Sequence, residues 1–228
     1  MRNCLMKSEK YFIPALRYNW LTKLYDPIVR NTMPEEKFKQ ALITQANISE
    51  NAQVLDFGCG SLTLSLIAKK RQPSAYIHAV DVDEKILKIA AEKQAQSGEE
   101  IFIQRYQGRV LPYRSNSFDR VISSLVFHHL DREQKINSFY EILGVLKPGG
   151  ELHIADWGMA KSALMRIAFY SIQFLDGFET TTDNVKGLLP KFLSQAGFQE
   201  VQVVQEFQSI FGTIALYKAI KPKVNIVL

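Results

Sequence analysis

The 228-residue sequence lacks the features that define several classes of protein. It has two cysteines, Cys4 and Cys59, which are too few for a disulfide framework, and no Cys/His cluster with the spacing of a zinc site. It also has no Pro-, Gly- or Ser-rich block of the kind that forms long flexible linkers. We therefore expect a folded chain without structural disulfides and without a bound metal.

Long hydrophobic runs are also absent. The longest apolar stretch, residues 163–175, is shorter than the roughly 20 residues that a membrane-spanning helix needs, and it contains Arg166. Residues 1–10 contain no apolar segment of signal-peptide length. Together with the low cysteine content, this predicts a cytoplasmic protein. Peripheral contact with a membrane surface stays open as a hypothesis.

The excess of positive charge is modest. A net charge of +5 and a pI of about 9.1 would attract polyanions. However, the basic residues are scattered, and the densest cluster, residues 69–71, falls where a helix is expected to end and to favour cations. No aromatic pattern typical of RNA-binding modules accompanies the charge. We therefore expect no nucleic-acid partner.

The sequence is rich in short apolar runs that alternate with longer amphipathic segments. Repeated strand-helix-strand units of this length predict a parallel sheet with helices on both faces. The last two predicted strands are too close in sequence for a crossover, so they must form an antiparallel hairpin. The predicted fold class is α/β, a Rossmann-like doubly wound seven-stranded sheet, mostly parallel with a C-terminal antiparallel hairpin. The predicted strands are 54–57, 76–80, 101–106, 119–125, 151–155, 201–207 and 213–219, with helices at 63–70, 84–96 and 132–146.

A helical segment is expected to precede the sheet. Residues 1–45 are rich in aromatic side chains, and Pro34 followed by two glutamates is a typical helix start. We expect an N-terminal helical cap or lid over residues 1–45 and a main domain over residues 46–228. A lid insertion is predicted at about residues 158–190 of that domain. Both lids would cover the carboxyl edge of the sheet and exclude water.

The motif V-L-D-F-G-C-G, residues 54–60, stands at the end of the first predicted strand. In doubly wound sheets, ligands bind beyond the carboxyl ends of the strands. Gly58 and Gly60 have no Cβ atom that would keep a bulky ligand away from this turn. Asp81, at the end of the second strand and about 20 residues further on, matches the acid that accepts hydrogen bonds from ribose hydroxyls. The combination predicts a nucleoside-binding site.

Two classes of cofactor compete for such a site. A dinucleotide site needs the pattern G-x-G-x-x-G, and here Thr63 occupies the third glycine position. A sulfonium cofactor has no pyrophosphate and instead needs an acid near its amino group, which Asp56 could provide. With the terminal hairpin, this favours S-adenosylmethionine over a nicotinamide dinucleotide.

Four stretches together resemble the class I S-adenosylmethionine-dependent methyltransferases. They are V-L-D-F-G-C-G, A-V-D-V-D-E-K-I-L, L-P-Y-R-S-N-S-F-D-R-V-I-S-S and L-K-P-G-G-E-L-H-I-A-D. Within the class, L-P-x-x-x-x-S-F-D and F-G-T-I-A-L-Y-K-A-I-K-P are most similar to the ubiquinone/menaquinone C-methyltransferase group. The resemblance covers roughly residues 50–220. It implies S-adenosyl-L-methionine as the cofactor and S-adenosyl-L-homocysteine as the product.

The resemblance also implies which residues hold the cofactor. Asp56 would lie near the methionine amino group, and Asp81 would bind the ribose hydroxyls. Gln107 stands where the family usually has Asp or Asn near the adenine amino group. Leu62 departs from the family pattern G-C-G-x-G, so the turn could be wider or the ligand displaced. The full predicted cofactor-binding set is Asp56, Gly58, Cys59, Gly60, Ser61, Asp81, Val82, Gln107, Gly108 and Ser124.

The sequence assigns no catalytic residue. Methyl transfer mainly requires alignment of donor and acceptor. A phenolic acceptor would gain from a general base, for which His128 and His129 in L-V-F-H-H-L-D are candidates, although helix-start packing also explains both. Tyr25, in L-Y-D-P, could close over the cofactor.

The expected function is methyl transfer to a small, partly apolar molecule such as a quinol or phenol. Two alternatives stay open. One is a protein that binds S-adenosylmethionine without turnover. This alternative stays open because Leu62 departs from the family pattern. The other is an NAD(P)-dependent dehydrogenase. The sequence predicts neither the methyl acceptor nor the oligomeric state.

Overall fold

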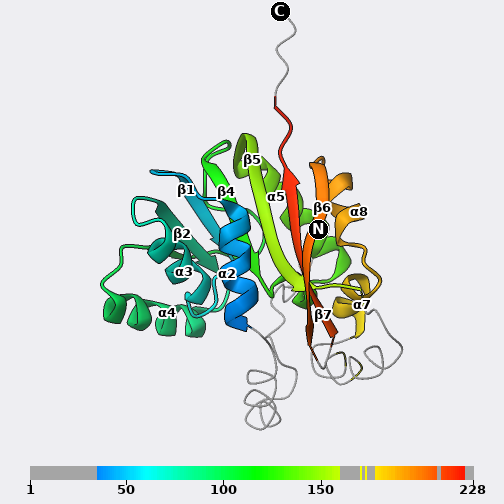
Figure 1. The fold of residues 1–228 in the computed structure, drawn as a ribbon, viewed down its shortest axis with the longest axis horizontal. Helices are drawn as coiled ribbons and strands as arrows, with labels where there is room; N and C mark the ends of the chain where they lie inside the picture. Colours follow the sequence, from blue (N-terminus) through cyan, green and yellow to red (C-terminus); the bar gives the residue numbers. More distant parts are fainter. Residues whose placement is uncertain (1–34, 160–169, 171–172, 174–177, 210–211, 224–228) are drawn as a thin grey trace, which may run out of the picture.

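The computed structural model describes residues 35–159, 170, 173, 178–209 and 212–223 of the chain (Figure 1). In this part of the chain, seven strands form a single sheet with the order β3-β2-β1-β4-β5-β7-β6. The strands are β1 (Gln53–Phe57), β2 (Tyr76–Asp81), β3 (Phe102–Arg105), β4 (Phe118–Ser124), β5 (Leu146–Trp157), β6 (Gln199–Ser209) and β7 (Gly212–Ile220). The helices are α2 (Glu35–Ala46), α3 (Thr63–Arg71), α4 (Glu84–Ser97), η1 (Phe127–His129), α5 (Arg132–Val145), α7 (Phe178–Val185) and α8 (Leu189–Gln195).

Strand directions follow the predicted pattern. β1 pairs in parallel with β2 and β4, β2 pairs in parallel with β3, and β4 pairs in parallel with β5. β7 is inserted between β5 and β6 and runs antiparallel to both. The predicted α/β fold, a Rossmann-like, mostly parallel sheet with a C-terminal antiparallel hairpin, is confirmed.

Helices cover both faces of the sheet. α2, α3 and α4 pack on one face, while α5 and α8 pack on the other (Figure 1). Because successive strand residues point to opposite faces, Val54 of β1 joins the core beneath α2 and α3, whereas Leu55 joins the core beneath α5. A parallel sheet buried on both faces explains why its strands read as nearly continuous apolar runs.

Helix α2 is part of the core packing. Phe38 and Leu42 are fully buried on its apolar face. At its C-terminal end, the Nε of Arg120 donates to the carbonyl oxygen of Ala46 at 2.8 Å, near the start of β4. The helix therefore runs antiparallel to the strands, and its first turn lies at their carboxyl edge. The boundaries of the predicted N-terminal lid stay a prediction, and residues 1–34 lie outside the described residues.

The boundary between α5 and β5 differs most in its physical cause from the prediction. β5 extends over Leu146–Trp157, because the Lys147-Pro148-Gly149-Gly150 segment continues the strand that was expected only at 151–155. Helix α5 accordingly ends at Val145. None of the helices in the described ranges combines the length and the hydropathy needed to cross a membrane.

Candidate functional site

The turn after β1 folds back onto the end of β2. The N–H groups of Gly58 and Cys59 both donate to the carbonyl oxygen of Val80 at 2.9 Å. Gly58 has φ +72° and Gly60 has φ +52°, which is the left-handed region that favours glycine. A Cβ atom on Gly58 would lie 2.4 Å from Cγ2 of Val126, so packing excludes any side chain there. A Cβ on Gly60 would meet none of the described residues within 4 Å, which leaves this backbone open to close approach.

The carboxylate of Asp81 holds the glycine turn in place. Its Oδ2 accepts a hydrogen bond from the N–H of Gly60 at 2.9 Å, and its Oδ1 accepts one from the N–H of Asp83 at 3.0 Å. Each carboxylate oxygen has two lone pairs, so both retain the capacity to accept a further hydrogen bond. The side chain thus fixes the turn and still presents an acceptor pair to a hydroxyl-bearing ligand.

A cavity of about 340 Å³ lies over the carboxyl ends of β1, β2 and β4. The turn after β1 and Lys39 of α2 line one part of the cavity. The segments after β2 and β3 line another part, with Val82, Ile86 and Tyr106 as its apolar groups. The remaining part is lined by the segment after β4 and by α5. The lining residues are Lys39, Phe57, Gly58, Cys59, Gly60, Ser61, Thr63, Asp81, Val82, Asp83, Ile86, Tyr106, Gly108, Ser124, Leu125, Val126, His129, Leu130, Gln134 and Ser138.

The structure brings most of the predicted cofactor-binding residues together. Asp56 and Gln107 are the exceptions: Asp56 is buried beneath the turn, and Gln107 is exposed. Their predicted contacts with a cofactor stay predictions. The predicted residues that line the cavity are Gly58, Cys59, Gly60, Ser61, Asp81, Val82, Gly108 and Ser124.

Leu62 adopts a left-handed backbone conformation, which glycine adopts without strain. It precedes α3 with φ +70°, and its side chain is fully buried in the core rather than among the cavity-lining groups. A left-handed conformation costs a non-glycine residue about 1–2 kcal/mol. Burial of a leucine side chain contributes about 1.5–3 kcal/mol, which offsets this strain. The turn therefore keeps a glycine-like course, and the leucine side chain does not obstruct the cavity.

Asp56 carries an unsatisfied oxygen in the protein interior. The hydroxyl of Ser65 donates to its Oδ2 at 2.6 Å, whereas its Oδ1 has no hydrogen-bond partner among the described residues. Burial raises the pKa of Asp56 to about 6, although the Ser65 hydrogen bond and the charge of Lys39 act in the opposite direction. The hydroxyl of Ser124, which lines the cavity, also lacks a partner within the described part of the chain.

Cys59 behaves as a small apolar residue of the turn. Its side chain is buried, and burial together with the nearby carboxylates of Asp56 and Asp81 raises the pKa of its thiol far above the usual range. A thiol in this state is not a nucleophile at neutral pH.

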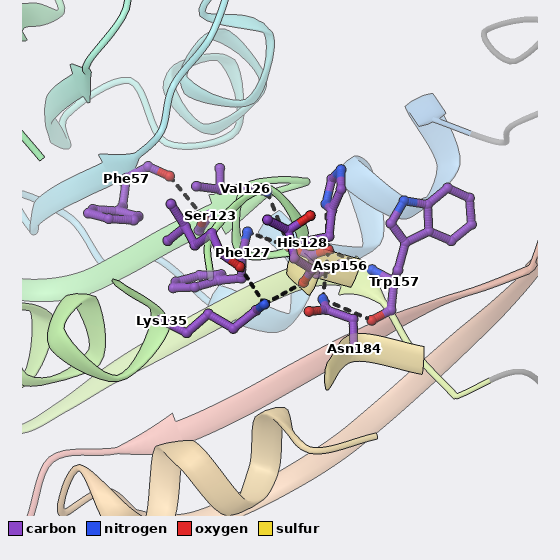
Figure 2. Close-up of polar contacts among 11 residues, drawn as sticks. Phe57, Ser123, Val126, Phe127, His128, Lys135, Asp156, Trp157 and Asn184 are labelled. Carbon is purple, nitrogen blue, oxygen red and sulfur yellow. Dashed lines mark hydrogen bonds and ion pairs between the residues drawn. The ribbon is translucent and has the colours of Figure 1, made fainter. Parts of the chain in front are cut away.

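On the other side of the cavity, Asp156 organises the segment after β4 (Figure 2). Its fully buried carboxylate accepts hydrogen bonds from the N–H groups of Val126 at 3.1 Å and Phe127 at 2.7 Å. It also interacts with Nδ1 of His128 at 2.8 Å and with Nδ2 of Asn184 at 3.2 Å. One carboxylate at the end of β5 therefore joins η1 to α7.

A buried lysine adds positive charge to this region. The ammonium group of Lys135 donates to the carbonyl oxygens of Leu130 and Thr180, both at 2.6 Å, and the side chain is fully buried (Figure 2). Burial lowers the pKa of Lys135 to about 8. Burial, and secondly electrostatic repulsion from His128 and Lys135, lowers the pKa of His129 well below its ordinary value. His129 is therefore neutral at pH 7.

The two candidate histidines have different environments in the structure. His128 is buried and bound to Asp156, and it does not line the cavity. His129 lines the cavity, with its ring centroid 3.9 Å from that of His128. Tyr25, the third candidate, lies outside the described residues.

Some cavity residues were not predicted from the sequence. Lys39 and Glu35 share one face of α2, but only the direction of that helix places Lys39 at the cavity. Ile86 lies near the start of α4, shortly after Asp81. Its helical spacing from the residues that follow Asp81 could have indicated that it lines the cavity. Gln134 and Ser138 of α5 have the i, i+4 spacing of one helix face, a signal too common to single them out.

Comparison with known proteins identifies the domain. A family model described as a methyltransferase domain matches residues 54–150. The chain is 32% identical over 124 residues to a ubiquinone/menaquinone biosynthesis C-methyltransferase of Wigglesworthia glossinidia brevipalpis, covering 53% of this chain and 48% of that protein. It is 28% identical over 198 residues to a demethylmenaquinone methyltransferase of Leptospira interrogans, covering 77% and 78% respectively.

The fold has solved counterparts as well. The crystal structure of an S-adenosylmethionine-dependent methyltransferase from Aquifex aeolicus superposes with a TM-score of 0.62 at 20% identity, covering 89% of this chain and 97% of that one. The chain spans about half the length of several curated relatives that it matches.

The structure is a doubly wound domain with a cavity over the carboxyl ends of its strands. The match of residues 54–150 to a methyltransferase domain supports the assignment to the class I S-adenosylmethionine-dependent methyltransferases that the sequence motifs predicted. S-adenosylmethionine is the cofactor that this assignment supports.

The strain at Leu62 predicts an unusual order of stability for two variants. Replacing Leu62 with Ala or Gly removes the same buried contacts, at a cost of about 2–5 kcal/mol. Ala keeps the left-handed strain of about 1–2 kcal/mol, whereas Gly does not. We therefore expect Leu62→Gly to be more stable than Leu62→Ala by about 1 kcal/mol in urea unfolding. An equal or opposite order would show that the turn is not strained.

The buried carboxyl of Asp56 predicts a stability that depends on pH. Its pKa near 6 in the folded protein exceeds the value of about 3.9 in an unfolded chain, so the charged form destabilises the fold, and this penalty grows as pH rises from about 4 to about 6. We expect Asp56→Asn to stabilise the ligand-free protein by about 1–3 kcal/mol at pH 7.5, and by much less at pH 4.5.

Urea unfolding of the Asp56→Asn variant at both pH values measures this effect. Glu92→Gln, which removes the same charge from an exposed position of α4, serves as the matched control. A gain from Asp56→Asn that is the same at both pH values would contradict the interpretation.

Proposed function

We propose that the protein transfers a methyl group from S-adenosylmethionine to a small, partly apolar acceptor. The observation that carries this proposal is the pairing of open backbone at Gly60 with the carboxylate of Asp81, within a domain of the methyltransferase family. Bound cofactor would supply a methyl group activated by the sulfonium charge. The residues of the chain would bind, orient and shield the reactants.

The cavity residues suit the parts of the cofactor in different ways. Asp81 retains acceptor capacity for the ribose hydroxyls. Val82, Ile86 and Tyr106 provide apolar surface for the flat faces of adenine. The turn after β1 offers the open backbone at Gly60 and the Ser61 hydroxyl along the methionine chain. These assignments follow the family resemblance and agree with the cavity lining.

The acceptor would enter beside the segment after β4. Leu125, Val126 and Leu130 give this part of the cavity an apolar lining, and His129 adds one neutral imidazole. Such a lining favours an apolar ring that carries a hydroxyl group. The names of the relatives, which describe methylation of ubiquinone and menaquinone precursors, support a quinol or phenol as the acceptor class.

Calorimetry followed by a transfer assay tests the proposal. We expect S-adenosylmethionine and S-adenosylhomocysteine to bind with micromolar dissociation constants, because enzymes commonly have KM values of about 1 μM–1 mM. NAD is expected not to bind. With a panel of quinols and phenols, we expect formation of S-adenosylhomocysteine and a methylated product.

Each other outcome has a definite meaning. Binding of NAD alone would support the dehydrogenase alternative, and binding of S-adenosylmethionine without turnover on any acceptor would support a non-catalytic protein. Turnover only on RNA or protein would contradict the small-molecule acceptor.

We propose that His129, which lines the cavity, contacts the acceptor. Its neutral ring can accept a hydrogen bond or a proton from an acceptor hydroxyl, which typically contributes about 10²–10⁴ in rate. We expect His129→Gln to lower kcat by about 100-fold while the dissociation constant for S-adenosylhomocysteine changes by less than about threefold. Because the pKa is low, the His129-dependent part of the rate should stay constant from pH 7 to pH 8 and fall only in acid.

His78→Gln is the matched control. His78 stacks on Phe102 away from the cavity, so this variant should retain the wild-type kcat. An unchanged kcat in His129→Gln would remove His129 from the mechanism.

A further inference from the structure

A fully buried lysine joins the segment that carries His129 to helix α7. The ammonium group of Lys135 donates to the carbonyl oxygen of Leu130, the residue next to His129, and to the carbonyl oxygen of Thr180 in α7, both at 2.6 Å (Figure 2). His129 and Leu130 line the cavity, whereas Lys135 is not among the cavity-lining residues. The lysine therefore holds the backbone of a cavity wall from the side that faces away from the cavity.

The charges that face this lysine come from three elements. Asp183 on α7, Asp156 on β5 and Asp131 at the start of α5 favour the charged form of Lys135, while burial and Arg132 disfavour it. Burial has the largest effect and lowers the pKa of Lys135 to about 8, so the ammonium group is charged at pH 7. Within the described ranges, its hydrogen bonds go to carbonyl oxygens and none goes to a carboxylate. Its positive charge is therefore not cancelled by an ion pair in direct contact.

This charge acts on His129. After burial, the groups that disfavour a protonated His129 are His128 and Lys135. A positive charge close to an imidazole raises the free energy of the imidazolium form, so the ring stays neutral and its lone pair stays available. If the ring takes a proton from an acceptor hydroxyl, the same repulsion favours release of that proton to water before the next turnover.

Packing alone does not require a lysine at this position. Desolvation of an ammonium group is costly, and a methionine would fill a similar volume without that cost. The two carbonyl contacts compensate part of the cost and join α5 to α7. A lysine with only this structural role would not change the protonation of His129.

We propose that Lys135 is a positioning residue for His129: its ammonium group fixes the cavity-wall backbone against α7, and its charge keeps the His129 ring neutral. The inference rests on the proposed function, in which His129 contacts the acceptor, and extends it to a group that does not line the cavity. The mechanical and the electrostatic parts of this role can be measured separately.

Titration of the His129 ring in the ligand-free protein tests the electrostatic part. NMR of its Cε1–H group, assigned by loss of the signal in His129→Gln, follows the protonation of the ring. In the unaltered protein we expect a midpoint well below the ordinary value of about 6.5, and a second, smaller change of the signal near pH 8 as Lys135 loses its proton. Lys135→Met removes the charge and should move the midpoint to higher pH and abolish the change near pH 8.

The same variant tests the mechanical part. We expect Lys135→Met to lower kcat by about tenfold, because a wall that is no longer held misplaces His129, while the dissociation constant for S-adenosylhomocysteine changes by less than about threefold. The acid limb of the pH dependence of kcat should move to higher pH, in the same direction as the NMR midpoint. Lys186→Met removes the same charge from an exposed position directly after α7 and should change neither kcat nor the midpoint.

The possible failures are distinct. If His129 of the unaltered protein titrates near its ordinary value of about 6.5, or if Lys135→Met leaves the midpoint unchanged, the inference is wrong whatever the activity. If Lys135→Met does not fold, the unaltered protein decides, because a His129 signal that stays constant around pH 8 contradicts the inference. If the NMR results are as expected but His129→Gln retains the wild-type kcat, the proposed role of His129 fails, while the effect of Lys135 on the ring is still established.

Discussion

The hydrogen bond from the N–H of Gly60 to the carboxylate of Asp81 joins the ends of two neighbouring parallel strands. Backbone at the carboxyl edge of a parallel sheet has no strand partner beyond the edge, so its donors need another acceptor. Asp81 satisfies the donor of the turn after β1 and, through the N–H of Asp83, the start of the segment after β2. The same carboxylate that shapes the cavity wall is therefore the group best placed to accept hydrogen bonds from a nucleoside.

Two other features keep this edge of the sheet in place. Leu62 accepts a strained backbone conformation because its side chain is buried in the core beneath α3. Across the cavity, Asp156 binds the backbone that follows β4 and fixes His128 (Figure 2). The next residue, His129, lines the cavity wall. The cavity thus lies between two turns that are each held by one aspartate at the end of a strand. Such anchoring is what a site that works mainly by alignment requires.

Much of the fold could be predicted because its signals are local. The alternation of apolar and amphipathic segments gave the order of strands and helices, and the short gap before β7 required an antiparallel hairpin. The part of the cavity that we propose to bind the nucleoside could also be predicted, because glycines at a strand end and an acid one strand later have a direct physical reason. Gly60 and Asp81 are the two residues in which that reasoning and the observed geometry agree most closely.

The positions of the other site residues depend on the direction in which helices and strands run in the folded protein. The spacing of residues in the sequence does not specify that direction. Lys39 reaches the cavity only because α2 runs antiparallel to the strands, with its C-terminal end tied to Arg120. The adjacent residues His128 and His129 look equivalent in the sequence. Asp156, which is distant in sequence, binds His128 and leaves His129 at the cavity wall. Leu62 could not be interpreted without knowing which way its side chain points. In each case the deciding contact joins residues that are distant in sequence.

A crystal structure of the protein with S-adenosylhomocysteine is the most direct test of the central claim. We expect the nucleoside over the ends of β1 and β2, with its ribose hydroxyls within hydrogen-bond distance of the Asp81 carboxylate and the turn at Gly60 unchanged. A nucleoside bound elsewhere, or a turn that must open and release Asp81 to admit it, would contradict the account.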